Sequence, residues 1–434
     1  MRIWLSLAMA SAWSRRSALL VVVLSVSISV ALILSVMQIR ADARSSFSEA
    51  VSGVDLIVGP RGSPTELLMY TVFQLGRATR NMPAETEQAI SGLRGVQWVV
   101  PMQLGDTYRN HAVWGSRPEL FERLRVRGQP ISFAQGRSFA DPRSSGLQSV
   151  FELVLGAELA DRFGHQLQDS IVLTHGAGGP LAQNHEQTPF RVVGILAPTG
   201  GPIDRAAVIS LEGFEAMHLG WGLGEFQGLR GALALLKPLE QLGSVDELKP
   251  RELTSLLVGL ESRGQVFAVR RAIESIPTTP LMAVLPGVAL DDLWRALAVG
   301  ENSLLVVGGL VALASVLSIS AVLLVSIASR RREFAVLRAV GARPRGLLVM
   351  LALESAFIAI AGIVLGLCAQ QLLIYASADS LRTMMGISLR PLSIPGEGWL
   401  ALAAVMLMAS MASLLPAVRA YRMSLQDGLN PPYV

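Results

Sequence analysis

The sequence is poor in cysteine, lysine and charge. Its 434 residues include one cysteine and two lysines, and only 16% of them are charged. A single cysteine, Cys368, excludes a disulfide framework and a cysteine-rich metal site. A P-loop needs a lysine followed by Ser or Thr after a glycine-rich loop, but Lys237 and Lys249 both precede proline. The chain therefore does not hydrolyse ATP through a P-loop of its own.

Motifs for catalysis and metal binding are also missing. The sequence contains neither a His-Glu-x-x-His helix nor a nucleophile elbow. The spacing of the five histidines is not that of metal ligands; they are His111, His165, His175, His185 and His218. We therefore expect no catalytic residue, metal or cofactor in this chain.

Apolar residues make up 51% of the chain, and they are clustered. A helix needs about 20 consecutive apolar residues to cross a bilayer. Four runs approach or exceed this length: residues 18–37, 303–328, 347–374 and 399–416. The sequence thus predicts an α-helical membrane protein with four transmembrane helices.

Arginine placement predicts the orientation of these helices. Arg15 and Arg16 precede the first run, six arginines lie between the second and third runs, and Arg419 and Arg422 follow the fourth. Short cytoplasmic segments of membrane proteins carry an excess of arginine and lysine. The excess of basic residues therefore indicates the membrane topology, and we expect no nucleic acid partner. The expected order is a cytoplasmic N-terminus (1–17), the first span, an outer domain (38–301), the second span, a cytoplasmic helix (329–346), the third span, an outer loop (375–398), the fourth span and a cytoplasmic tail (417–434).

The first span has a second interpretation. Ala41-Asp42-Ala43 fits the small-x-small pattern of a signal-peptide cleavage site. Cleavage would leave three spans in the same orientation. The apolar run of twenty residues is longer than a typical signal core, which favours an uncleaved anchor.

The region between the first two spans predicts a mixed α/β domain of two lobes on two stalk helices. Residues 38–51 extend the first span, and residues 290–299 lead helically into the second. Short β-rich runs alternate with helical patterns, separated by Gly and Pro clusters. We expect strands at 54–58, 150–155, 170–174, 190–196, 206–210, 253–260 and 281–285, and helices at 157–163 and 265–276.

A markedly apolar segment, residues 66–75, has two interpretations. It is either a core helix of the outer domain or a helix at the membrane interface beside an opening for a substrate. Its apolar residues are nearly continuous, which weakens the amphipathic signal. The residues concerned are Leu67, Leu68, Met69, Tyr70, Val72 and Phe73.

The third span holds the only acid within the predicted spans, Glu354. Acids inside a membrane are often functional. The alternative places Glu354 near the cytoplasmic surface, paired with an arginine of the preceding loop. Gly362 and Gly366 of the same span are spaced for close approach of another helix.

The cytoplasmic segment 329–346 predicts a compact helix with a defined end. Gly341 can adopt the left-handed conformation that ends a helix, and Pro344 suits the first turn of the next one. A segment that only fixed the topology would need neither a helical pattern of apolar residues, here Phe334, Leu337 and Val340, nor a defined helix end. The candidate site residues are Arg331, Arg332, Glu333, Phe334, Leu337, Arg338, Val340 and Gly341.

This segment resembles the FtsX-like permease family, the membrane subunits of MacB-type (type VII) ABC systems. The matching residues are Arg331, Arg332, Glu333, Ala335, Leu337, Arg338, Ala339, Gly341 and Ala342, then Leu353 and Glu354. Residues 112–115, 153–156 and 190–196 resemble the MacB-like periplasmic core domain more loosely. Residues 53–82 depart from the usual start of that domain.

The resemblance implies a multi-pass protein of the bacterial cytoplasmic (inner) membrane. Helix 329–346 would be the coupling helix that docks on a separate ABC ATPase. Two ATPase copies, which bind ATP and Mg, would work with two permeases, this chain paired with itself or with a homologue. Such systems move the outer domain mechanically.

Three roles remain open at this point. The first is export or extraction of a lipid, lipoprotein or other amphiphile, with membrane lipids and a periplasmic adaptor or lipoprotein as partners. The second is a non-transport regulator that activates a periplasmic enzyme. The third, outside ABC systems, is a membrane-anchored sensor.

Overall fold

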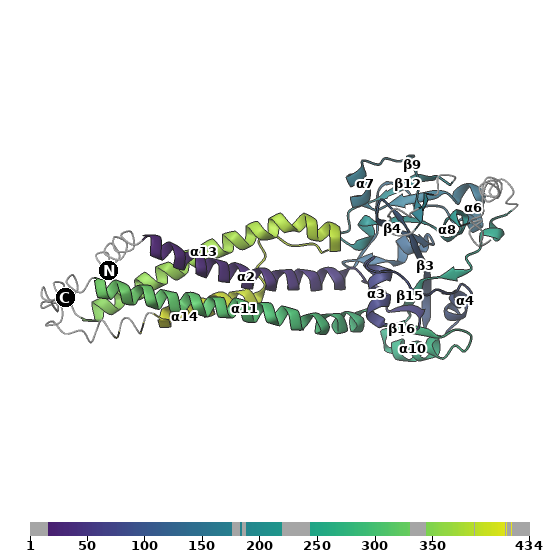
Figure 1. Cartoon of the computed structure of the whole chain (residues 1–434). Helices are drawn as coiled ribbons and strands as arrows, with labels where there is room; N and C mark the ends of the chain where they lie inside the picture. Colours follow the sequence, from purple (N-terminus) through teal and green to yellow (C-terminus); the bar gives the residue numbers. More distant parts are fainter. Residues whose placement is uncertain are drawn as a thin grey trace. The chain divides into compact units, whose positions relative to one another are not determined.

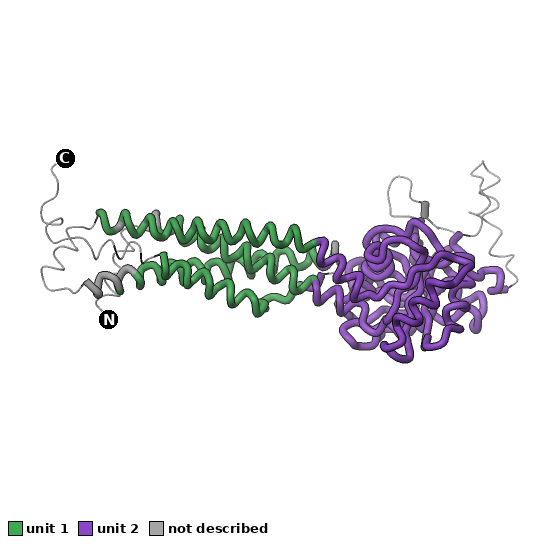
Figure 2. The backbone as a smooth tube through the Cα atoms, turned by 90° about the horizontal axis from the view of Figure 1, so that it is seen from below, with its two compact units in different colours: residues 1–43, 297–381, 389–434 green, residues 44–296, 382–388 purple. Residues whose placement is uncertain are grey.

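The computed structural model describes residues 16–175, 183–184, 188–218, 244–329, 344–385 and 387–412, with the single residues 414 and 418. The chain divides into two compact units, which are coloured separately in Figure 2. The helical unit comprises Met1–Ala43, Leu297–Leu381 and Leu389–Val434. The α/β unit comprises Arg44–Ala296 and Arg382–Ser388.

The helical unit is built from all or part of four helices: α2 (Arg16–Glu49), α11 (Pro286–Ser329), α13 (Pro344–Met385) and α14 (Gly396–Ala412). Within the described residues, three of them, α2, α11 and α13, are long and apolar enough to cross a membrane. Helix α14 has 17 residues and falls short of that length. The first three predicted spans thus lie in membrane-type helices, whereas the fourth, at 399–416, stays a prediction.

The helical unit has an apolar core to which all four helices contribute. Val26 and Val30 of α2 pack with Leu323 of α11, Ile358 of α13 and Val405 of α14. Figure 1 shows the four helices side by side. Many large apolar side chains on their other faces remain exposed, as expected for helices surrounded by lipid.

Two glycines let α13 approach α2 closely. A Cβ atom added at Gly362 would lie 2.6 Å from Val26 Cγ1, and one at Gly366 would lie 2.8 Å from Val30 Cβ and 2.9 Å from the Ser27 carbonyl oxygen. Real side chains do not approach this closely without a shift of the neighbours. The close contact predicted from the spacing of these glycines is therefore confirmed.

A buried polar network joins α2, α13 and the segment before α14. The Gln38 side chain accepts a hydrogen bond from Gln370 and donates one to the Arg390 carbonyl oxygen at 2.6 Å. The Arg390 backbone N–H donates to Asp42 Oδ2 at 3.0 Å. Asp42 is buried within the helical unit, so this network ties α2 to the segment before α14.

The α/β unit is built on a mixed sheet in which the structure describes twelve strands. Neighbouring pairs are antiparallel except β4 with β13 and β8 with β12. The main path runs β16 (Leu281–Val284), β1 (Leu56–Pro60), β15 (Ser255–Leu260), β3 (Val96–Tyr108), β4 (His111–Ser116), β13 (Ala207–Ser210), β8 (Glu152–Leu155), β12 (Phe190–Leu196) and β7 (Phe133–Gly136). Beside this path, β9 (Ser170–Ile171) pairs with β12, β10 (Thr174–His175) with β3, and β11 (Gln183–Asn184) with β10.

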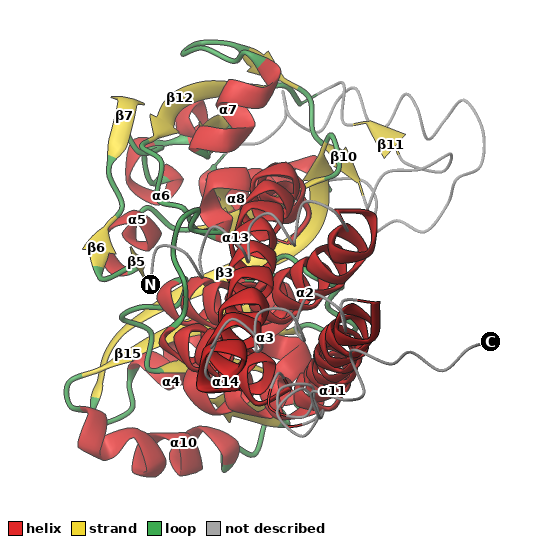
Figure 3. Cartoon of the chain, turned by 90° about the vertical axis from the view of Figure 1, so that its left-hand side faces the viewer, coloured by secondary structure: helices red, strands yellow, loops and turns green. Residues whose placement is uncertain are grey.

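Short elements complete the unit, as Figure 3 shows. The helices are α3 (Pro64–Val72), α4 (Thr86–Ser91), α5 (Glu119–Arg123), α6 (Pro142–Ser145), α7 (Ala157–Phe163), α8 (Leu211–Met217) and α10 (Val266–Glu274). Two small pairs are β2 (Met82–Pro83) with β14 (Glu252–Leu253) and β5 (Arg125–Val126) with β6 (Gln129–Pro130). Single turns of 3₁₀ helix lie at Leu147–Ser149, Pro202–Arg205, Val245–Leu248 and Arg263–Gln265.

Strand β3 joins two hydrophobic cores. Its first half pairs with β15, and its second half pairs with β4. One core lies around β1, β15, β16 and α10, and the other around β4, β8, β12, β13 and α8. The mixed α/β fold is thus confirmed, and the two cores share β3 within one compact unit. Strands β3 and β4 were not among the expected strands, although they hold the unit together.

Gly366→Ala should destabilise the helical unit. The new methyl group overpacks the contact with Ser27 and Val30, at a typical cost of about 1–3 kcal/mol. The measurement is thermal unfolding of the full chain in detergent, with a lower midpoint expected than for the wild type.

Gly309→Ala is the matched control for this substitution. Gly309 lies in α11, and nothing is within 4 Å of its would-be Cβ. The midpoint of thermal unfolding of this variant should be unchanged or slightly raised, because Ala is more favourable than Gly in a helix by up to about 1 kcal/mol. Equal midpoints for the two variants would contradict a close contact between α13 and α2.

Candidate functional site

The last turns of α2 and the first turns of α11 meet in the α/β unit through aromatic side chains. Phe47 of α2 lies with its ring centroid 4.2 Å from that of Phe73 and 5.7 Å from that of Trp294 in α11. The Arg44 guanidinium lies 5.5 Å from the Trp294 ring centroid. The three rings are buried. We call Arg44, Phe47, Phe73 and Trp294 the stalk-end cluster.

Polar contacts hold the same end of α2. Glu49 pairs with the Arg127 side chain at 2.9 Å, and its carbonyl oxygen accepts a hydrogen bond from the Arg127 backbone N–H, also at 2.9 Å. The last turn of α13 is held as well, since its Arg382 lies 3.7 Å from Glu158 of α7. Backbone and side-chain contacts thus fix the helix ends to the domain.

Helix α3 is a core helix of the α/β unit. It begins with Pro64 in the first turn after the N-cap Ser63. Of the six apolar residues singled out in the sequence, five are buried and Met69 is partly buried. Neighbours cover most of the helix surface, since α3 packs on β1 and β16, and Phe73, at its end, joins the stalk-end cluster. Of the two interpretations of this segment, burial of these side chains favours the core helix.

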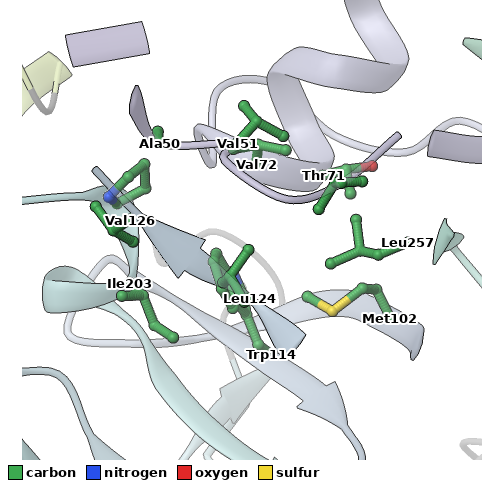
Figure 4. Close-up of a pocket in the computed structure, with 12 residues that line it drawn as sticks. Ala50, Val51, Thr71, Val72, Met102, Trp114, Leu124, Val126, Ile203 and Leu257 are labelled. Atoms are coloured by element: carbon green, nitrogen blue, oxygen red, sulfur yellow. The ribbon is translucent and has the colours of Figure 1, made fainter. Parts of the chain in front are cut away.

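A small apolar pocket lies between the end of α2, α3 and the sheet, as Figure 4 shows. Its lining includes Val51, Val72, Trp114, Val126 and Leu257. Its cavity volume is about 10 Å³, enough for roughly one water molecule. This pocket therefore has no room for an acyl chain.

The membrane-side candidates are described only in part. The eight coupling-helix residues, from Arg331 to Gly341, lie outside the described residues. Glu354 is 4% exposed and faces the interior of the helical unit from α13. The predicted pairing of Glu354 with an arginine of the preceding loop also falls outside the described residues.

The structure brings together three residues that linear spacing did not connect: Asp106 of β3, His175 of β10 and His218, which follows α8. His175 Nδ1 lies 2.8 Å from Asp106 Oδ1 and 3.1 Å from His218 Nε2. His218 Nε2 lies 3.3 Å from Asp106 Oδ2. The signal is tertiary, because Asp106 and His175 face each other only through the pairing of β3 with β10.

The charges in this group are coupled. Burial acts to raise the pKa of Asp106, but its contacts with His175 and His218 outweigh burial and lower the pKa to about 2. Burial acts to lower the pKa of His218, but the adjacent Asp106 carboxylate outweighs it and raises the pKa. The carboxylate is thus held in its charged form and favours a positive charge beside it.

Phe47→Ala should destabilise the α/β unit. Truncating a buried phenylalanine typically costs about 3–5 kcal/mol, and here it also removes two ring contacts. Phe267→Ala is the matched control, because Phe267 of α10 is 69% exposed. Chemical unfolding of both variants in detergent measures the difference, and equal losses of stability would contradict a structural role of the cluster.

Comparison with known proteins gives two family matches. The MacB-like periplasmic core domain matches residues 19–276, and the FtsX-like permease C-terminal region matches residues 305–425. No curated protein matches the chain.

Two solved structures of extracytoplasmic regions are similar to part of the chain. The extracellular domain of the noncanonic ABC-type transporter YknZ from Gram-positive bacteria is 14% identical, with a TM-score of 0.31, over 53% of this chain and 98% of that one. The periplasmic region of MacB from Actinobacillus actinomycetemcomitans is 12% identical, with a TM-score of 0.33, over 57% of this chain and 97% of that one.

The two family matches follow one another along the chain, and the first alone covers more than half of it. The interval between them, residues 277–304, holds β16 and the first part of α11, a helix that contributes residues to both units. The chain therefore belongs to the FtsX-like permeases that carry a MacB-like periplasmic core domain.

Proposed function

We propose that this chain is the permease subunit of an ABC-type transporter in which ATP hydrolysis by a separate subunit moves the periplasmic domain. The observation that carries the proposal is the continuity of two helices. Helices α2 and α11 each hold a predicted membrane span and run on without interruption to the stalk-end cluster. A displacement of either span is thereby passed along one covalent, hydrogen-bonded rod.

The two helices suit this mechanical role. Helix α2 has 34 residues and α11 has 44, which corresponds to roughly 50 and 65 Å at the usual rise per residue. Neither helix has a proline after its first residue, and proline is a principal cause of sharp kinks. Close packing of Phe47 with Trp294 makes their ends move together, because a packed interior transmits displacement.

The energy source lies in a partner in this proposal. The sequence has no P-loop, so ATP and Mg bind to the ATPase, of which two copies serve two permeases. Segment 329–346 docks on the ATPase as the coupling helix, with both termini on the cytoplasmic side of the inner membrane. The arginine distribution supports this orientation.

Exposed apolar residues on α11 support pairing with a second copy of the chain. Val288 is 51% exposed and Val299 is 73% exposed, and both precede the predicted second span. Large apolar side chains outside the membrane favour a contact surface. We propose that these residues face the partner permease in a homodimer.

The cargo we propose is a lipid, lipoprotein or other amphiphile. The apolar pocket beside α3 is too small to enclose it. In this proposal, motion of the domain displaces a cargo that is not enclosed in this pocket. The same domain motion would also suit a regulator that activates a periplasmic enzyme. The protein or lipid that co-purifies with the chain distinguishes the two roles.

Phe334→Ala should abolish association with the ATPase while leaving membrane insertion intact. Phe334 would be buried in the groove of the ATPase, and such a loss typically costs about 3–5 kcal/mol. Phe357→Ala is the matched control, since Phe357 of α13 is 58% exposed. The measurement is recovery of the ATPase with the tagged chain from mild detergent.

The same purification, followed by mass spectrometry, tests the whole proposal. An ATPase in equal amount supports the permease role, and a co-purifying lipoprotein or lipid supports amphiphile export. A retained cell-wall hydrolase supports the regulator. Recovery without any ATPase, repeated after crosslinking in cells, or full ATPase binding by the Phe334 variant, contradicts the coupling model.

A further inference from the structure

We propose that Asp106, His175 and His218 form a binding site for a divalent transition-metal ion, with Zn²⁺ as the best match. We call these residues the metal triad. Two imidazoles and one carboxylate are typical ligands of such ions. The triad lies within the periplasmic domain, so the proposal does not depend on the transport mechanism.

The distances between the ligand atoms fit one shared ion. In a tetrahedral zinc site with bonds of about 2.0–2.1 Å, ligand atoms lie roughly 3.3 Å apart. The two imidazole nitrogens of the triad are 3.1 Å apart, and their nearest carboxylate oxygens are at 2.8 and 3.3 Å. One ligand atom from each residue lies within 4.8 Å of the other two. A small shift of side chains would place all three around one ion.

A second contact orients His218 as a metal ligand. Its Nδ1 lies 2.7 Å from the Phe214 carbonyl oxygen, which can only accept, so Nδ1 carries the proton. In the neutral ring, Nε2 then presents a lone pair toward Asp106 and His175. Metal-binding histidines commonly donate their other N–H to a carbonyl or carboxylate in this way. The His218 ring also stacks on Phe214, with centroids 5.1 Å apart.

The site suits a positive charge at its centre. The Asp106 carboxylate only accepts hydrogen bonds, and its side chain is 0% exposed. Asp106 Oδ2 faces His218 Nε2 at 3.3 Å. A bound cation would be shared by all three groups at once.

One side of the triad remains accessible. The His175 side chain is 41% exposed, whereas that of His218 is 21% exposed. Three protein ligands with an open side leave a position for water or an external ligand. A bound ion would also join β3, β10 and the end of α8, and so brace the central strand of the sheet.

Metal analysis of the full-length chain in detergent tests the proposal. The protein is treated with a chelator, reloaded with Zn²⁺, separated from free metal and measured by inductively coupled plasma mass spectrometry. We expect one zinc per chain. Asp106→Asn and His218→Gln should weaken zinc binding at least tenfold. His111→Gln, on the neighbouring strand β4, is the matched control and should bind normally.

Two further readouts hold even if a triad variant folds poorly. Zn²⁺ should raise the thermal midpoint of the wild type and of the His111 variant, because a ligand that binds only the folded state stabilises it. Co²⁺ should give the visible absorption of a nitrogen- and oxygen-ligated ion, without a thiolate band. No retained zinc in the wild type, equal zinc in the triad variants, or a thiolate band from Cys368 would each overturn the proposal.

Discussion

The packing of Phe47 against Phe73 and Trp294 is the interaction that holds the end of α2 and the start of α11 together in the α/β unit. It joins the ends of two helices that enter the α/β unit from opposite ends of its sequence. Burial of the rings makes these ends one body with helix α3 and the sheet. In the mechanism that we propose, this contact lets motion of a span reach the domain as a defined displacement.

The same contact explains why α3 is so apolar. A helix with one face in a core normally shows a stripe of apolar residues, with polar residues opposite. Helix α3 packs on β1 and β16, and Phe73, the residue that follows it, packs under α2, so most of its surface is covered. The nearly continuous run from Leu67 to Phe73 therefore reflects burial on several sides. Hydropathy alone does not distinguish this burial from contact with lipid.

Polar groups in the two units are organised in different ways. In the helical unit, Gln38, Gln370 and Asp42 satisfy one another and the Arg390 backbone, as buried groups away from water must. In the α/β unit, Asp106 is buried beside two imidazoles, whose nearest nitrogens lie 2.8 and 3.3 Å from its carboxylate oxygens. The first arrangement is complete without an ion. The second concentrates negative charge and lone pairs at one point, which is the physical basis of the proposed metal triad.

The sequence by itself determined the membrane character, the inserted α/β domain and the family, because hydrophobic length, strand and helix periods and the Arg-Glu-Leu-Arg-Gly pattern are local properties. Local patterns also located α7, β12 and the Gly362–Gly366 contact surface. Only the tertiary structure decided that β3 joins two cores, that α3 is internal, and that Asp106, His175 and His218 meet. These features depend on strand pairing between distant segments, and spacing along a chain carries no information about which strands become neighbours.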